Sequence, residues 1–375
     1  MFTPESRRAD FPSLEGRSYF NTAAEGIPPL SVLHALEQYG QDKLLGMDGR
    51  AKHEAVWDRA KQELADAYGL STDEVSFCSC SSEAFNLAAL ALQLQPGDEV
   101  VINDLDFPAG STPWLQESSP ATVKVWKSRD FALHPDDLKP LLSPRTRLVT
   151  TSLVSFFNGF KIDVPEVTRL VRAHSPALFA LDVTQGLGRI PLELSDVDLI
   201  ISSTHKWILA SHGGGLVGVP AHRAAEWTVP AGGWFNLQNA FEADRFEKTV
   251  TKQGAASFSV GMPNYPAIYA IEAGLSYIRQ QSIPKINDYC QPLYDHCFAE
   301  LNKLDVEMLT PSDPANQAGI MAFRHPDAER IYKHLHAENI HLMYHAGRLR
   351  IAIHGYNSEA DVERLLAGIH SAVKS

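Results

Sequence analysis

Cysteine and net positive charge are both scarce in this sequence of 375 residues. The four cysteines, Cys78, Cys80, Cys290 and Cys297, have the spacing of neither a paired zinc site nor a secreted disulfide framework. We therefore expect no metal site and assign all four to packing. Lysine and arginine number 33 against 45 aspartates and glutamates, a formal charge of −12. Without a basic excess there is little counterion release, so binding to nucleic acid or anionic lipid is not expected.

Long apolar runs and the common nucleotide-binding motifs are also missing. No stretch approaches the ~20 apolar residues that a bilayer crossing needs, and the first residues contain no run of signal-peptide length. Together with the cysteine pattern, this predicts a cytoplasmic protein with no membrane partner. No GxGxxG follows a strand, GxxxxGKS and GxxxxGKT are absent, and GGGLVG at 213–218 leads into a strand instead of a helix. A nucleotide-binding enzyme is therefore disfavoured.

The first two thirds of the chain alternate between short apolar runs and stretches with helical spacing. Runs such as ALFALDV are almost continuously apolar, as strands covered on both faces require. This pattern predicts an α/β domain with a seven-stranded, mostly parallel sheet. The expected strands are 75–78, 99–103, 123–127, 147–153, 178–182, 199–203 and 215–219, and the expected helices are 51–68, 83–93, 135–142 and 164–173.

The remainder of the chain predicts a smaller α+β domain. A Gly, Pro and aromatic stretch begins near residue 225, and a connecting helix is expected over 265–279. Short strands near 306–309, 319–323, 340–343 and 349–353, a helix at 326–337 and an amphipathic closing helix should follow. The predicted organisation is an N-terminal segment at 1–20 that packs on the small domain, a large domain at 21–240, and the connecting helix with the small domain at 241–375.

An acid and a lysine follow two of the predicted core strands. Asp182 ends the strand at 178–182, and Lys206 follows the strand at 199–203. In open parallel sheets the carboxyl ends of the strands line the ligand crevice, so both side chains should face one site. Taken singly, the acid could be a turn residue and the lysine a solvated charge. Together they suit pyridoxal phosphate (PLP), with the lysine as Schiff base and the acid keeping the pyridine nitrogen protonated.

A helix N-terminus after the first strand offers a place for the cofactor phosphate. The segment SFCSCSSEAF ends a strand at Cys78, and Ser81, Ser82 and Glu83 then open a helix. Free backbone N–H groups and the helix dipole favour an anion there. The signal is weak alone, because many helices begin with serine followed by an acid.

These motifs, from YFNTAAEGIPP at 19–29 to RIAIHGYN at 350–357, resemble the aminotransferase class V family of fold type I PLP-dependent transferases. That family includes cysteine desulfurases, isopenicillin N epimerase-like proteins and hercynylcysteine sulfoxide lyases. The resemblance implies a homodimer with shared active sites and a catalytic Schiff-base Lys206. It also implies cofactor contacts by Ser81, Ser82, Phe107, Asp182, Gln185, Ser203, His205, Gly261 and Met262, and substrate contacts by Asn21, Ala23, Ala24, Arg350 and His354.

The implied roles differ among these residues. Gln185 would donate to the ring hydroxyl oxygen, while the serines and His205 would form the phosphate cradle. Phe107 stands where relatives have a ring-stacking residue, commonly histidine. Arg350 would clamp the substrate α-carboxylate with its bidentate fork. The backbone of Gly261 and Met262 would reach the neighbouring subunit's cofactor.

The sequence also departs from the family pattern. Phe156 replaces an asparagine near the ring, with Asn158 as the candidate to compensate for it, and Met262 replaces a threonine. The segment NIHLMYHAGRLR at 339–350 lacks the nucleophilic cysteine of cysteine desulfurases, so persulfide transfer to a cysteine there is not expected.

The expected reaction begins with an external aldimine and removal of the Cα proton by Lys206. We favour β-elimination of the C–S lyase type, with Tyr344, His345 or His354 as a possible acid for the leaving group. The alternatives are transamination with a keto acid, epimerisation, or a catalytically silent protein with the same fold.

Overall fold

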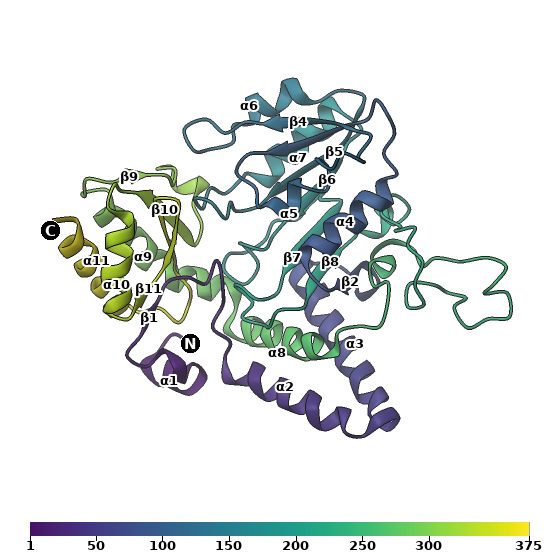
Figure 1. Cartoon of the computed structure of the whole chain (residues 1–375), viewed down its shortest axis with the longest axis horizontal. Coiled ribbons are helices and arrows are strands. Elements are labelled where there is room, and N and C mark those ends of the chain that lie inside the picture. Colours follow the sequence, from purple (N-terminus) through teal and green to yellow (C-terminus); the bar gives the residue numbers. More distant parts are fainter. Residues whose placement is uncertain (375) are drawn as a thin grey trace.

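The computed structural model describes residues 1–374, so Ser375, the end of the predicted second domain, lies outside the described residues. A seven-stranded sheet with the order β2-β8-β7-β6-β5-β3-β4 forms the centre of the larger domain (Figure 1). Only β8 runs against its neighbours β2 and β7, which confirms the mostly parallel sheet. Its strands are β2 (Val75–Cys78), β3 (Glu99–Asn103), β4 (Thr122–Trp126), β5 (Thr146–Ser152), β6 (Leu178–Asp182), β7 (Leu199–Ser203) and β8 (Gly215–Gly218).

Helices cover both faces of this sheet. Phe179 and Ile200 pack into one apolar cluster, whereas Ala180 and Ile201 pack into another on the opposite face. Burial on both faces explains the continuous apolar runs of the central strands. On one face α2 and α3 pack against α8. The helices of this domain are α2 (Leu30–Lys43), α3 (Arg50–Tyr68), α4 (Ser81–Leu92), α5 (Pro108–Ser111), α6 (Pro135–Leu138), α7 (Val164–His174) and α8 (Tyr265–Gln281).

The smaller domain combines a four-stranded antiparallel sheet with three helices (Figure 1). Its strand order is β12-β13-β10-β9. The single strand expected at 340–343 is wrong: it is two strands in different sheets, because β11 leaves this sheet to pair with β1 near the N-terminus. The elements are β1 (Ser18–Tyr19), α9 (Ile283–Leu301), β9 (Glu307–Met308), β10 (Ile320–Arg324), α10 (Ala328–Ala337), β11 (Ile340–His341), β12 (Met343–His345), β13 (Arg348–Ala352) and α11 (Glu359–Lys374).

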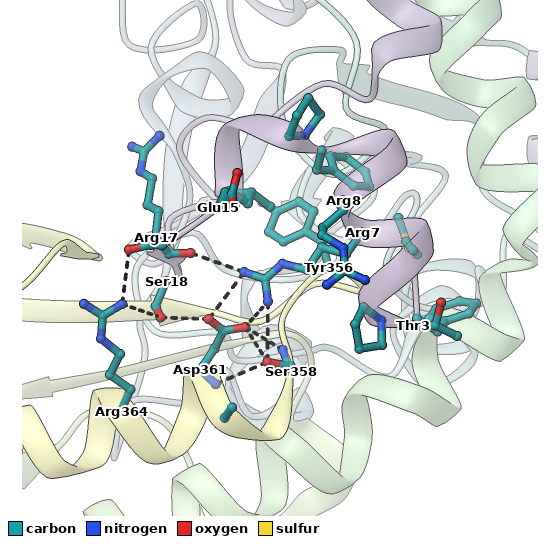
Figure 2. A pocket seen from close by; sticks show the side chains of 18 of the residues that line it. Thr3, Arg7, Arg8, Glu15, Arg17, Ser18, Tyr356, Ser358, Asp361 and Arg364 are labelled. Carbon is teal, nitrogen blue, oxygen red and sulfur yellow. Dashed lines mark hydrogen bonds and ion pairs between the residues drawn. The ribbon is translucent and has the colours of Figure 1, made fainter.

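The N-terminal segment packs against the smaller domain. After α1 (Pro4–Asp10), Phe11 and Leu14 enter the same apolar cluster as Ile351. Arg7 forms an ion pair with Asp361 of α11 (Nη1 to Oδ2, 2.5 Å), at the edge of the pocket drawn in Figure 2. The chain then passes through β1 towards the larger domain, so this segment joins the small domain to residues beside the main sheet.

Two other features complete the fold. Between β8 and α8 the chain forms a long loop that extends away from the sheet, on the right of Figure 1. Among residues 1–374, no helix is both long and apolar enough to cross a membrane.

Candidate active site

A small cavity lies at the carboxyl ends of β6 and β7. Asp182 is the last residue of β6 and is in register with Ile201 of β7, and Lys206 follows β7 by three residues. The predicted convergence of acid and lysine is therefore present. The cavity contains about 260 Å³ without protein atoms, open solvent at its mouth included. It is lined by Ser81, Phe107, Ser152, Phe156, Asp182, Thr184, Gln185, Ser203 and Lys206.

Lys206 is buried in this cavity without a polar partner. No hydrogen bond or ion pair joins Nζ to any residue in the described part of the chain, and Nζ lies 5.2 Å from the centre of the Phe107 ring. Burial lowers the pKa of Lys206 to about 8, against the opposing effect of the Asp182 charge. An amine with this pKa is partly uncharged near neutral pH and can act as nucleophile or base.

Asp182 lies beside Lys206 in the cavity and is buried to a similar extent. Burial raises the pKa of Asp182, while hydrogen bonding from Thr184 and the charge of Lys206 oppose that shift. The Thr184 backbone N–H donates to Asp182 Oδ1 at 2.8 Å, and this bond fixes the carboxylate at the strand end. Such a carboxylate can hold a protonated heterocyclic nitrogen, whose positive charge would compensate for the burial.

Small hydroxyl residues also line the cavity. Ser81 Oγ and Ser203 Oγ are 2.9 Å apart, which brings the N-terminus of α4 next to the end of β7. The Ser203 N–H donates to Thr184 Oγ1 at 2.9 Å. Ser82 is exposed and does not line the cavity. The first turn of α4, together with the Ser81 and Ser203 hydroxyls, can therefore donate to an anion.

The N-terminal segment lies next to the cavity and contacts it through Gln185. Gln185 Nε2 donates to the Ala23 carbonyl (3.0 Å), and Gln185 Oε1 accepts from Trp207 Nε1 (2.6 Å). Asn21 bridges to Ala352 of β13, and its buried Oδ1 has no hydrogen-bond partner among residues 1–374. The Ala24 N–H donates to the Asn21 carbonyl at 2.9 Å.

Gly26 holds this segment close to the lysine. Its N–H donates to the His205 carbonyl at 2.8 Å, and a Cβ at Gly26 would collide with the Lys206 carbonyl oxygen. Only glycine permits this approach, so the position of the N-terminal segment beside Lys206 depends on it.

Arg350 approaches the cavity from the smaller domain. Its Nη1 donates to the Phe156 carbonyl at 2.7 Å, and Phe156 itself lines the cavity and contacts Phe107 edge-on at 5.1 Å. Burial lowers the pKa of Arg350 to about 9, and the nearby Arg348 adds to the shift. The predicted carboxylate-binding residue thus lies at the border of the site without an anionic partner in the described chain.

Besides Ser82, Asn21, Ala23, Ala24 and Arg350, which do not line the cavity, four further predicted site residues lie outside it. His205 stacks on His212 with ring centres 4.5 Å apart, and His212 contacts Glu25. His354 is buried beyond Trp207, where its Nε2 lies 3.0 Å from the Trp207 carbonyl oxygen. Gly261 and Met262 line a separate groove.

Asn158 does not replace the missing asparagine. Its amide is buried and bonded to the carbonyls of Phe131 and Leu309 and to the N–H of Phe160. All these partners are backbone atoms, so Asn158 holds loops together away from the cavity.

The aminotransferase class-V family model matches residues 18–365. The chain belongs to the aminotransferase class-V family. This confirms the resemblance that the sequence motifs indicated.

The chain is similar to other proteins over most of its length. It is 25% identical to the uncharacterized aminotransferase YcbU of Bacillus subtilis, over 97% of this chain and 96% of that protein. It is 25% identical to a probable cysteine desulfurase of Methanothermobacter thermautotrophicus, over 85% of this chain and 80% of the relative.

Solved structures show the same fold. An apo cysteine desulfurase from Thermococcus onnurineus NA1 superimposes with a TM-score of 0.89 at 21% identity, covering 100% of this chain and 99% of the other. The cystine C–S lyase C-DES, in complex with its reaction product cysteine persulfide, gives 0.86 at 23% identity, covering 96% and 98%. The predicted α/β fold class is confirmed.

Sequence reasoning missed three residues of this class-V site. Thr184 and Ser152 line the cavity, and Asp106 accepts a hydrogen bond from the Ser152 N–H at 2.8 Å. Burial raises the pKa of Asp106 to about 7, with a contribution from Asp182. The available signal was the position of each residue at or just after a core strand, as for Asp182.

One cysteine in this class-V chain contradicts its expected packing role. Cys80 is exposed, and its Sγ accepts from the Glu83 N–H as the N-cap of α4. Cys290 and Cys297 are buried, and Cys78 is half-buried. A capping position explains the exposure of Cys80, because an N-cap lies outside the packed helix.

Proposed function

We propose that this protein is a PLP-dependent lyase that removes the Cα proton of an amino acid and expels a sulfur-bearing group from Cβ. The observation that carries the proposal is the buried, unpartnered Lys206 amine beside Asp182 at the ends of β6 and β7. Membership of the class-V family supports it.

The residues present fit PLP. Lys206 offers a free amine, Asp182 a buried carboxylate and Phe107 a ring face, while Ser81 and Ser203 offer donors at the N-terminus of α4. Lys206 would hold the cofactor through Nζ, Asp182 would hold its ring nitrogen, and the serines would hold its phosphate. When bound, PLP supplies an electron sink for the negative charge that develops at Cα.

Lys206 would also act as the base. Once substrate frees its Nζ, the amine would accept the Cα proton, since a pKa of about 8 leaves a useful uncharged fraction near neutral pH. The aromatic side chains of Phe107 and Phe156 contact each other edge-on and line the cavity next to Lys206.

Arg350 would orient the substrate. Its guanidinium is held by the Phe156 carbonyl and retains further N–H donors for a carboxylate. Fixing the α-carboxylate there, with Asn21 and Ala23 on the neighbouring N-terminal segment, would hold the substrate in one orientation for proton removal by Lys206.

Elimination is favoured over persulfide transfer because residues 339–350 contain no cysteine and none lines the described cavity. The solved neighbour C-DES is named a cystine C–S lyase. Transamination is the second candidate, supported by the name of the Bacillus subtilis relative.

The test is incubation of the holoenzyme with a panel of amino acids, with pyruvate, ammonia, sulfide and keto acid measured separately. Pyruvate and ammonia formed without an amino acceptor support elimination. Strict dependence on an added keto acid supports transamination instead, and no turnover of any amino acid contradicts the proposal.

We further propose a cytoplasmic homodimer. All four cysteines are free, as a reducing compartment requires. The groove at Gly261 and Met262 has a half-exposed Met262 side chain that a second subunit would cover. Analytical ultracentrifugation of wild type and Met262→Glu tests this, because a charge at the contact should weaken the dimer.

A further inference from the structure

Building on the proposed function, we propose that Arg348 is a second anion-binding residue of this site. The substrate would then carry a carboxylate at the end of its side chain in addition to its α-carboxylate. Our model substrate is an S-carboxyalkyl cysteine, with the leaving sulfur between the two carboxylates.

Arg348 and Arg350 project from the same face of β13. They are two residues apart on one strand, so their side chains point to the same side of the sheet. Arg350 Nη1 donates to the Phe156 carbonyl (2.7 Å), and Arg348 Nη1 donates to the Phe157 carbonyl (2.5 Å). The two guanidinium groups are therefore anchored side by side on one loop of the larger domain.

That loop borders the proposed cofactor cavity. Phe156 lines the cavity, and the Arg348 guanidinium lies 5.7 Å from the centre of its ring and 4.1 Å from that of Phe157. With an α-carboxylate held at Arg350, a side chain that extends along β13 would bring its far end to Arg348.

Neither arginine has an acidic partner among residues 1–374. Each is only 4% exposed, neither takes part in an ion pair with a described residue, and the buried Nε of each has no hydrogen-bond partner. Burial lowers the pKa of Arg348 to about 10, and Arg324 across the sheet adds to the shift. Arg324 itself is paired with Glu307 and is more exposed.

Two adjacent buried cations without an anion are costly, because burial of a charge is tolerated mainly when it is paired. One carboxylate would compensate Arg350 and leave Arg348 uncompensated. A dicarboxylate would satisfy both, and the planar guanidinium fork suits each carboxylate group.

The reaction of this substrate class balances without an added oxidant or reductant. In S-carboxymethyl-cysteine the Cα proton passes to Lys206 Nζ and the Cβ–S bond breaks, with its electron pair leaving on sulfur as thioglycolate. The remaining three-carbon amine takes up one water and yields pyruvate and ammonia.

A structural role for Arg348 as a tie for the 156–157 loop would also explain its bond to Phe157, so the test must separate the two roles. We choose a matched pair of inert ligands, 3-(carboxymethylthio)propionate and 3-(carbamoylmethylthio)propionate. In the second ligand an amide replaces the carboxylate of the carboxymethyl group. Neither carries an amine, so their binding is independent of catalysis. Calorimetry on the holoenzyme should give at least about tenfold tighter binding of the dicarboxylate.

Arg348→Gln should remove this preference without weakening binding of the amide, whereas the control Arg324→Gln should keep it. Equal affinity of the two ligands for wild type overturns the proposal, as does a preference retained in Arg348→Gln. If Arg348→Gln does not fold, Arg348→Lys should keep a reduced preference, and an undiminished one contradicts the bidentate role.

The corresponding amino acids connect the site to catalysis. On wild type, kcat/KM for S-carboxymethyl-cysteine should exceed that for S-carbamoylmethyl-cysteine by about tenfold, and Arg348→Gln should abolish the difference. If the inert dicarboxylate binds as expected but neither amino acid undergoes elimination, the result supports the anion site and contradicts the proposed lyase activity.

Discussion

Charged residues are arranged differently in the N-terminal pocket of Figure 2 and in the active-site cavity. In the pocket, Asp361 accepts hydrogen bonds from Arg7, Ser18 and Ser358. These bonds outweigh burial and lower the pKa of Asp361. In the cavity, Lys206 has no polar partner in the described chain and burial raises the pKa of Asp182.

The charges of the N-terminal pocket are satisfied within the chain and stabilise the fold, whereas we expect the charges of the cavity to be compensated by a bound ligand. A buried ion satisfied by its own chain helps to hold elements together, as Asp361 joins α1, β1 and α11. A buried ion left unsatisfied lowers stability until a ligand binds and compensates it. Mutations in the cavity should therefore lower activity without lowering stability, whereas mutations in the N-terminal pocket should lower stability without lowering the activity of the folded protein.

Lys206→Ala should have the largest effect. Loss of both the covalent anchor and the base should reduce kcat by about 10³-fold or more, while cooperative unfolding is retained. Turnover assays and thermal denaturation check this, with the exposed Lys139→Ala as control. Normal turnover in Lys206→Ala would remove the mechanism.

Asp182→Asn should come next. The neutral amide cannot keep the ring nitrogen protonated, so we expect kcat to fall by about 10²-fold. The pKa of Asp182 is raised in the fold, so its contribution to stability is present below its unfolded pKa and is lost as pH rises. At pH 7 the cofactor-free variant should therefore unfold at a higher temperature than cofactor-free wild type. A lower unfolding temperature would contradict this account.

Asp361→Asn should show the reverse pattern. Loss of its charge-assisted hydrogen bonds should destabilise the fold by about 1–3 kcal/mol, with kcat per folded molecule unchanged. The pKa of Asp361 is lowered from 3.8, so its contribution is present above that value and is lost as pH falls through the folded pKa. Denaturant titrations between pH 3 and 7 should show that the free energy of unfolding falls less steeply with decreasing pH in the variant than in wild type. An equal pH dependence in the two proteins would refute the assignment.

The smallest expected effect is that of Ser81→Ala. Removal of one donor to an anion should weaken PLP binding by about tenfold, equivalent to ~1.4 kcal/mol. The neighbouring Ser82 is exposed, so Ser82→Ala is the matched control and should change affinity less. Equal losses in a spectroscopic titration would place both hydroxyls in the phosphate cradle.

Local sequence patterns predicted the central strands of the larger domain and the proximity of Asp182 to Lys206. The strands that end near Asp182 and Lys206 are apolar and flanked by turns, so both their bounds and the meeting of these side chains followed from parallel-sheet geometry. Helices α1 and α2 were not predicted, since α1 has no buried residue and α2 buries only two. The pairing of β11 with β1 spans more than 300 residues and leaves no local signal.

Some residues of the site were missed for the same reason, because their contacts leave no local signal in the sequence. Thr184 and Asp106 act through hydrogen bonds to groups on other strands, which residue spacing does not encode. Arg348 resembles any strand-end arginine until its burial and lack of an acidic partner are known. Satisfaction of charge is a three-dimensional property, and this property distinguishes the cavity from the N-terminal pocket.

The central claim is that Lys206 carries the cofactor. Borohydride reduction of the purified holoenzyme, followed by peptide mass spectrometry, tests it most directly. We expect the pyridoxyl group on the peptide containing Lys206, and none in Lys206→Ala. A label on another lysine, or a wild-type protein that takes up no PLP, would contradict the account.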